Sequence, residues 1–185
     1  ITSLQFYLKN YNFIDNIEGN TDRIKIRIRW YGNLFGQIDN PILEIKIKKG
    51  ALGKKISVPI SPFLFSRETN IIDILSSIKY LKKDLNIDFQ SLIPSLLNRY
   101  SRKYYQSSNK KFRITIDHKQ SYYRINKKEN SFLDNYYDHD SVIFELKYDQ
   151  KYSEEAEFIT TIFPFRITKN SKYVTGVMKY MHMQS

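Results

Sequence analysis

Residues 23–30 read RIKIRIRW, and this stretch decides the fold that the rest of the chain supports. Its cations alternate strictly with large apolar side chains, so a β-strand here places four cations on one face and four apolar groups on the other. Residues 43–48, which read LEIKIK, repeat the alternation after a turn. Because like charges side by side on neighbouring strands are destabilising, we expect an anion to lie between these cations.

The composition is that of a basic protein of one domain. The 185 residues include 30 Lys and Arg against 19 Asp and Glu, a formal net charge of +11. This excess points to an anionic partner such as nucleic acid, a membrane surface, a nucleotide or a phosphate polymer. The absence of cysteine excludes disulfides and thiolate metal sites, and is compatible with a reducing compartment. No apolar run reaches the ~20 residues that span a bilayer, so we expect a cytoplasmic protein that reaches a membrane only through a partner.

The periodicity predicts an α+β domain built on a large antiparallel sheet. Strands are expected over residues 2–8, 22–31, 41–49, 54–60, 97–106, 111–117, 121–126 and 141–149. A helical insertion is expected over residues 68–97, in pieces at 68–85 and 89–97, with further helices at 154–162 and 171–181 and a loop at 127–140. If the sheet closes into a barrel with helices outside, the charged strand faces line its lumen.

Four of the predicted strands carry charged side chains at alternate positions. They are Arg27 and Arg29, then Glu44, Lys46 and Lys48, then Arg113 and Asp117, and finally Glu145 and Lys147. Arginine forks match pairs of phosphate oxygens, and lysines supply movable point charges. A bare glutamate would repel phosphate, so Glu44 and Glu145 serve either as ion partners of nearby cations or as oxygen ligands for Mg²⁺ or Mn²⁺. The alternative is ordinary half-buried sheet with charges in solvent, and four strands with the same pattern argue against it.

These strands resemble a known family. Residues 26–32, IRIRWYG, and residues 43–46, LEIK, are similar to the paired strand motifs of the VTC (vacuolar transporter chaperone) domain. That domain is the polyphosphate polymerase branch of the triphosphate tunnel metalloenzymes, in the CYTH-like superfamily. Its later motifs resemble residues 100–102, 112–117, 144–148 and 168–173 in the same order. The resemblance covers residues 2–177, and R-x-R-W-Y-G is its most specific part.

The resemblance implies an eight-stranded antiparallel tunnel that binds triphosphate, polyphosphate or pyrophosphate, with Mn²⁺ or Mg²⁺ as the metal. Carried over by residue, the implied catalytic groups are Arg27, Arg29, Lys46 and Glu145. The implied phosphate contacts are Arg27, Arg29, Lys46, Lys48, Arg102, Arg113, Lys147, Lys169 and Lys172. The implied metal ligand is Glu145, with Glu44 as a second candidate. A helix beginning near Ser171 would also turn its free N–H groups towards an anion.

The sequence departs from the family pattern in two places. The opening strand of the superfamily, which carries alternating Glu and Lys, is absent, so the tunnel is either incomplete or completed by residues outside this sequence. In addition, Tyr7 stands where many relatives have an acidic residue.

For function, the resemblance implies a polymerase that transfers the γ-phosphate of ATP, or of another nucleoside triphosphate, to a polyphosphate chain. Because the acceptor is itself an anion, no general base is required, which agrees with the small number of histidines. The same cage would serve a metal-dependent triphosphatase that positions water, or a non-catalytic module that binds polyphosphate or inositol phosphates. The presence of Glu145 argues against the non-catalytic module.

Nucleic acid is a disfavoured partner. Binding single strands requires exposed aromatic rings on a basic face. Trp30, Phe112 and Phe144 fall instead on the strand faces opposite the charges, where core residues belong.

Overall fold

The computed structural model describes residues 1–8, 23–50, 52–81, 87–126, 128, 130–164, 166–168 and 170–182. The strands are β1 (Thr2–Leu8), β2 (Arg23–Trp30), β3 (Gly36–Ile38), β4 (Ile42–Lys49), β5 (Leu52–Pro59), β6 (Phe63–Phe65), β7 (Leu92–Gln106), β8 (Arg113–Arg124), β9 (Asn135–Asp138) and β10 (Ile143–Lys147). The α-helices are α2 (Ile71–Ser77), α4 (Ser153–Ile162) and α5 (Lys172–His182). The α+β class is thereby confirmed.

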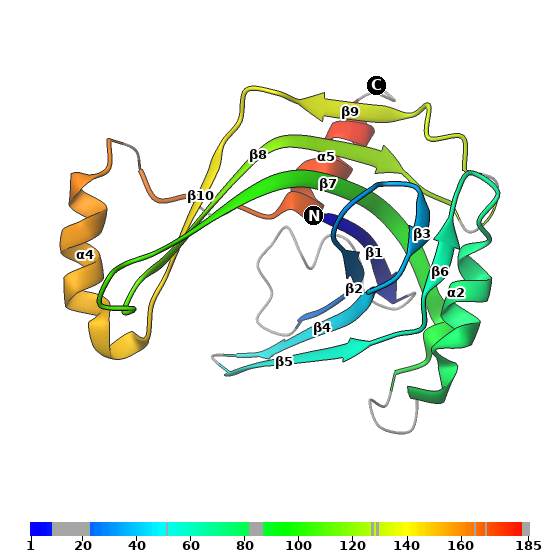
Figure 1. Ribbon diagram of the computed structural model, residues 1–185, viewed down its shortest axis with the longest axis horizontal. Helices are drawn as coiled ribbons and strands as arrows, with labels where there is room; N and C mark the ends of the chain where they lie inside the picture. The colour runs from blue at the N-terminus through cyan, green and yellow to red at the C-terminus, as the bar shows by residue number, and fades with distance from the viewer. Residues whose placement is uncertain are drawn as a thin grey trace.

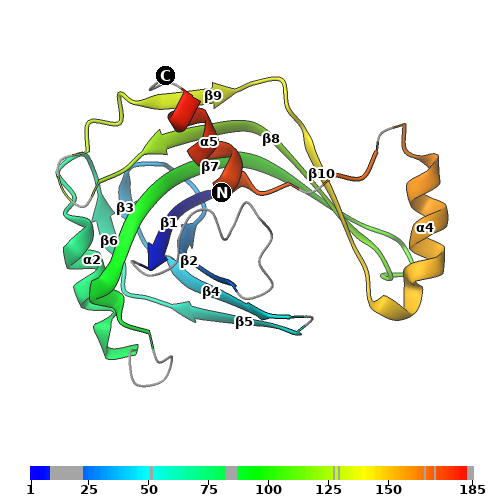
Figure 2. The same ribbon diagram turned by 180° about the vertical axis from the view of Figure 1, so that it is seen from behind.

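Eight strands form one antiparallel sheet in the order β10-β8-β7-β1-β2-β4-β5, with β9 also paired to β8. The sheet bends into an arch, with β7 and β8 on one limb and β4 and β5 on the other (Figure 1). Figure 2 shows the same arch from behind. Within the described ranges no strand pairing joins β10 to β5, so the antiparallel sheet is confirmed and its closure into a barrel stays a prediction.

The apolar side chains of the basic strands form the core, as their alternation predicts. Ile26, Ile28 and Trp30 of β2 are almost completely buried. Trp30 packs edge-on against Phe63 and Phe65 of the small β3–β6 sheet, and α2 buries its own apolar side chains in the same cluster. Burying one face of each strand in this way leaves the charged side chains on the other face.

The predicted helical insertion over residues 68–97 is wrong at its end, because β7 begins at Leu92. Among the described residues of this span only α2 is α-helical, and residues 82–86 of the expected helix lie outside the described residues. The N-cap of α2 is Asn70, whose side chain accepts a hydrogen bond from the backbone N–H of Ile72. Short 3₁₀ turns follow at Lys79–Leu81 and Phe89–Ser91. At the start of β7, Leu92, Leu96 and Leu97 are buried while Ile93 is half-buried, so the apolar spacing imitates a helix, whereas Pro94 disfavours one.

A second difference concerns β8, which joins the strands expected separately at residues 111–117 and 121–126. The register of β8 against β7 shifts between Arg99 and Ser101, and Lys119 has a φ of 53°. These features are typical of a β-bulge, so residues 118–120, which lie between the two expected strands, are an irregularity within one strand. The expected loop at 127–140 also contains β9.

The third difference is the position of α5, which was expected on the outside of the sheet. Gly176 of α5 lies against the side chains of Leu96 and Tyr122. Register pairs connect Tyr122 to Asn98, Asn98 to Ser3, and Ser3 to Arg29. Directly paired residues point to the same face of a sheet, so α5 packs on the face that carries the charges. No helix in the described part of the chain has the length and apolar character needed to cross a membrane.

Candidate functional site

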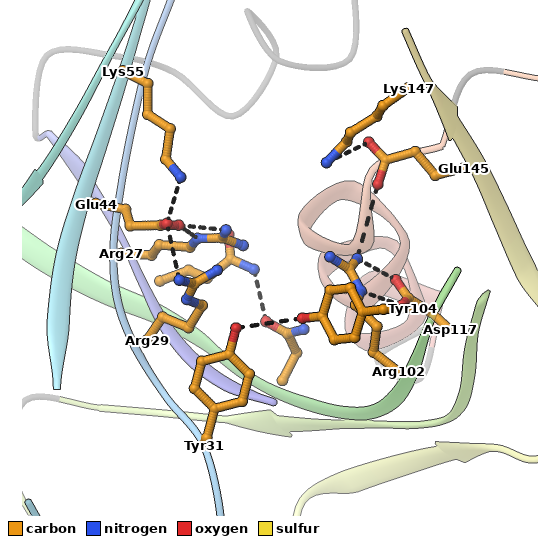
Figure 3. Close-up of polar contacts among 12 residues, drawn as sticks. Arg27, Arg29, Tyr31, Glu44, Lys55, Arg102, Tyr104, Asp117, Glu145 and Lys147 are labelled. Carbon is orange, nitrogen blue, oxygen red and sulfur yellow. Dashed lines mark hydrogen bonds and ion pairs between the residues drawn. The ribbon is translucent and has the colours of Figure 1, made fainter. Parts of the chain in front are cut away.

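Two groups of charged side chains lie opposite each other on this face of the sheet (Figure 3). The group named the Glu44 wall consists of Arg27 and Arg29 of β2, Glu44 of β4 and Lys55 of β5. The group named the Asp117 wall consists of Arg102 of β7, Asp117 of β8, Glu145 and Lys147 of β10 and Lys172 of α5. The structure therefore brings together residues that lie far apart in the sequence.

Glu44 is the centre of its wall. Its side chain is 1% exposed and accepts a hydrogen bond from Nε of Arg27 at 2.7 Å, while Lys55 Nζ lies 2.8 Å and Arg29 Nη2 3.4 Å from its second oxygen. Burial opposes ionisation of this carboxyl, but the hydrogen bond from Lys55 and the charge and hydrogen bond of Arg27 outweigh it and lower the pKa of Glu44 to about 2. Three cations around one carboxylate leave a positive excess on this wall.

Asp117 has the same role on the opposite wall. Its side chain is 1% exposed, and its Oδ2 lies 2.7 Å from Nη2 of Arg102 and 2.6 Å from Nζ of Lys172. Burial opposes ionisation, but hydrogen bonds from Arg102 and Lys172 lower the pKa of Asp117. Burial lowers the pKa of Lys172, and Asp117 partly offsets this effect. The pair of cations is thus held in place by one buried carboxylate.

Glu145 differs from both central carboxylates because its side chain is 46% exposed. One oxygen lies 3.3 Å from the hydroxyl of Thr115 and 3.9 Å from Arg102 Nη2, and the other lies 3.5 Å from Lys147 Nζ. A carboxylate with this much exposure has room for a further ligand. It lies beside cations without being enclosed by them.

The other predicted phosphate contacts have different surroundings. Lys46 is paired in register with both Lys25 and Lys55; burial, followed by the charge of Arg27, lowers its pKa. Lys48 lies two residues further along β4 and is exposed. Arg113 is exposed and is paired across strands with Lys147. Lys169 lies outside the described residues, as does the side chain of Tyr7.

Three buried polar atoms on this face have no hydrogen-bond partner within the described part of the chain, although one of them, Oε1 of Glu44, forms an ion pair with Lys55. The other two are Nε of Arg29 and Oγ of Ser3. Ser3 and Arg29 are directly paired between β1 and β2, so both atoms lie on the same side of the sheet. An unpaired buried donor is costly, and an oxygen atom of a bound anion would satisfy it.

Helix α5 places Lys172 next to Asp117 in the Asp117 wall. Lys172 is its first residue, and the hydroxyl of the preceding Ser171 accepts a hydrogen bond from Lys25 Nζ at 3.3 Å. The start of α5 therefore contacts β2 as well as β8. A Cβ atom added at Gly176 would lie 2.6 Å from both Leu96 and Tyr122, so a glycine is needed for this close approach.

We expect Gly176→Ala to lower the stability of the protein by about 1–3 kcal/mol, the usual cost of overpacking. It should also weaken tripolyphosphate binding, because Lys172 lies one turn earlier on the same helix. Thermal unfolding and calorimetric titration measure the two effects. Met178→Ala, at an exposed position of α5, is the matched control. A higher melting temperature for Gly176→Ala would show that helix propensity outweighs the contact.

Sequence reasoning missed three residues of the site. Asp117 was recognised as charged but not included among the site residues, and Lys55 was not singled out. Asp117 alternates with Ile114 and Ile116, which was the available signal, whereas Lys55 directly follows Lys54 and alternates only with Ile56 and Val58. Tyr104 was also missed; its hydroxyl lies 3.3 Å from that of Tyr31.

Comparison with known proteins identifies a family. The family model of the VTC domain matches residues 1–181. Among curated proteins, none matches this chain.

Proposed function

The chain belongs to the VTC domain family, which indicates a polyphosphate-related function, and from this premise we propose that it is a polyphosphate polymerase-like phosphotransferase. It would transfer the γ-phosphate of a nucleoside triphosphate to a growing polyphosphate chain. One observation carries the proposal: two facing walls each hold arginine and lysine around a buried carboxylate. The cations are thereby ordered before any ligand arrives, and their positive excess remains to bind a polyanion.

Pre-ordered cations suit phosphoryl transfer because the protein has little covalent chemistry to perform. Arg27 and Arg29 would bind phosphate oxygens from one wall and Arg102 and Lys172 from the other, which holds donor and acceptor phosphates in line. The unpaired Nε of Arg29 and Oγ of Ser3 offer two further contacts to a phosphate oxygen. An acceptor phosphate is already an anion, so no residue of the site has to accept a proton from it.

The family also implies a divalent metal, and Glu145 fits that requirement. In the described residues there is no cluster of three or more His, Cys, Asp or Glu that could hold a metal ion. Mg²⁺, however, is commonly bound by one or two carboxylates together with substrate phosphates, and Glu145 has the exposure for this. Glu44 is enclosed by three cations, so we propose that it is an ion partner only. A bound metal would supply positive charge to phosphate oxygens during transfer.

Product analysis tests the proposal. We expect the purified protein, incubated with ATP and Mn²⁺, to produce a ladder of polyphosphate on a stained polyacrylamide gel. A blank gel with accumulating free phosphate would identify a triphosphatase instead. No turnover, with tripolyphosphate binding retained, would identify a polyphosphate- or inositol-phosphate-binding module. Heat-inactivated protein and reactions without metal are the controls.

A further inference from the structure

Two tyrosines meet at one end of the site. The hydroxyls of Tyr31 and Tyr104 lie 3.3 Å apart and come from opposite walls (Figure 3). β2 and β7 are both antiparallel to β1, so they run in the same direction. Tyr31 comes two residues after Arg29, and Tyr104 two residues after Arg102. The tyrosine pair therefore lies beyond both arginines, at the same end of the charged face.

Both rings are anchored and yet open to solvent. The guanidinium carbon of Arg29 lies 5.3 Å from the ring centre of Tyr31, and that of Arg102 lies 5.8 Å from the ring centre of Tyr104. Tyr31 is nevertheless 55% exposed and Tyr104 58% exposed. A cation over one face and a hydrogen bond at the hydroxyl orient each ring, while its remaining surface can contact a ligand.

The opposite end of the charged face is cationic. Going from Arg27 away from Tyr31, the next residue on the same face of β2 is Lys25, which is paired in register with Lys46 and, through it, with Lys55. The acidic side chain beside this row is Glu44, 2.8 Å from Lys55. Three lysines exceed its single negative charge, so the row keeps a positive excess that favours an anion. On the Glu44 wall the face thus changes from an aromatic ring, through arginines, to lysines. On the Asp117 wall, Arg113 and Lys147 form the next row of the same face beyond Tyr104.

We propose that Tyr31 and Tyr104 bind the nucleoside of the nucleoside triphosphate, with the base against their rings, while the lysine end takes the phosphate chain. This inference rests on the proposed function. A nucleoside triphosphate has an uncharged aromatic head and an anionic tail, which matches the change in character along the Glu44 wall. A polyphosphate chain is anionic throughout and gains most at the lysine row.

The test compares two ligands that share a triphosphate but differ in the nucleoside. ATP and tripolyphosphate are titrated calorimetrically, at equal ionic strength, into the wild type, Tyr104→Ala, Tyr104→Phe and Tyr105→Ala. Stacking of a base on an aromatic side chain contributes substantially to the binding free energy, whichever base it is. We therefore expect Tyr104→Ala to raise the Kd for ATP roughly 5- to 100-fold. The Kd for tripolyphosphate should change less than about twofold, because the arginines remain.

The two other variants are matched controls. Tyr104→Phe keeps the ring and should retain ATP affinity within about threefold, since a single neutral hydrogen bond contributes little net free energy. Tyr105 is similarly exposed at 51% but points to the other face of β7, so Tyr105→Ala should leave both ligands unchanged. Thermal unfolding checks that each variant is folded.

Three outcomes would overturn the inference. Equal weakening of ATP and tripolyphosphate by Tyr104→Ala would mean that the ring only positions Arg102, and unchanged ATP binding would mean that it contacts no base. A wild type that binds neither ligand would overturn the proposed function as well. If the gel shows no polyphosphate but both ligands still bind, the polymerase function is rejected. The titrations then decide separately whether Tyr104 contacts the nucleoside.

Discussion

Glu145→Gln is expected to reduce polyphosphate formation by about 100-fold or more, the scale on which removal of one group that stabilises transition-state charge lowers turnover. Glu145 is the exposed carboxylate of the Asp117 wall, and its replacement removes the proposed metal ligand without removing an arginine or lysine. Tripolyphosphate binding in the absence of metal should therefore remain the same or become tighter. Initial rates from the stained gel and metal-free titrations measure the two effects.

The matched control is Glu155→Gln, the same substitution on α4. Glu155 is 49% exposed and pairs with Lys111 at 2.8 Å, away from the facing walls. Glu155→Gln should form polymer at a rate within about twofold of the wild type, because an exposed ion pair contributes little to stability. Unchanged turnover in Glu145→Gln would remove this residue from the proposed metal site.

Glu44→Gln is expected to destabilise the protein by about 3–5 kcal/mol, the usual cost of removing one partner of a buried ion pair. The amide leaves Arg27, Arg29 and Lys55 without their shared carboxylate. A bound polyanion would offset the repulsion among these three cations. Tripolyphosphate should therefore raise the melting temperature of Glu44→Gln by more than that of the wild type, and thermal unfolding with and without the ligand measures this.

The same residue predicts a pH dependence. The pKa of Glu44 is about 2 in the folded protein against an ordinary value of 4.5. A lowered pKa contributes stability above the unfolded value, and this contribution is lost as the pH falls towards the folded value. The stability difference between the wild type and Glu44→Gln should therefore shrink between about pH 5 and about pH 2. A constant difference across that range would show that Glu44 is not ionised in the folded protein.

The alternation of charged and apolar residues was sufficient to predict which residues share a face. Arg27, Arg29, Glu44 and Lys46 lie where the period of two places them, because a strand with one apolar face has only one way to bury it. The same reasoning failed at Leu92–Leu97, where every residue of β7 is buried or half-buried and the apolar run no longer identifies a strand. The same reasoning also predicted two strands in place of β8, which continues through its bulge.

The sequence by itself determined the family, the antiparallel sheet and the sign of the charge on its polar face, since these follow from local pattern. Only the tertiary structure decided that Glu44 collects three cations, that Asp117 joins Arg102 to Lys172, and that α5 lies on the charged face. These contacts join strands and a helix that are distant in the chain. These contacts depend on the curvature of the sheet and on the space at Gly176. The alternation of residues along a single strand predicts neither of them.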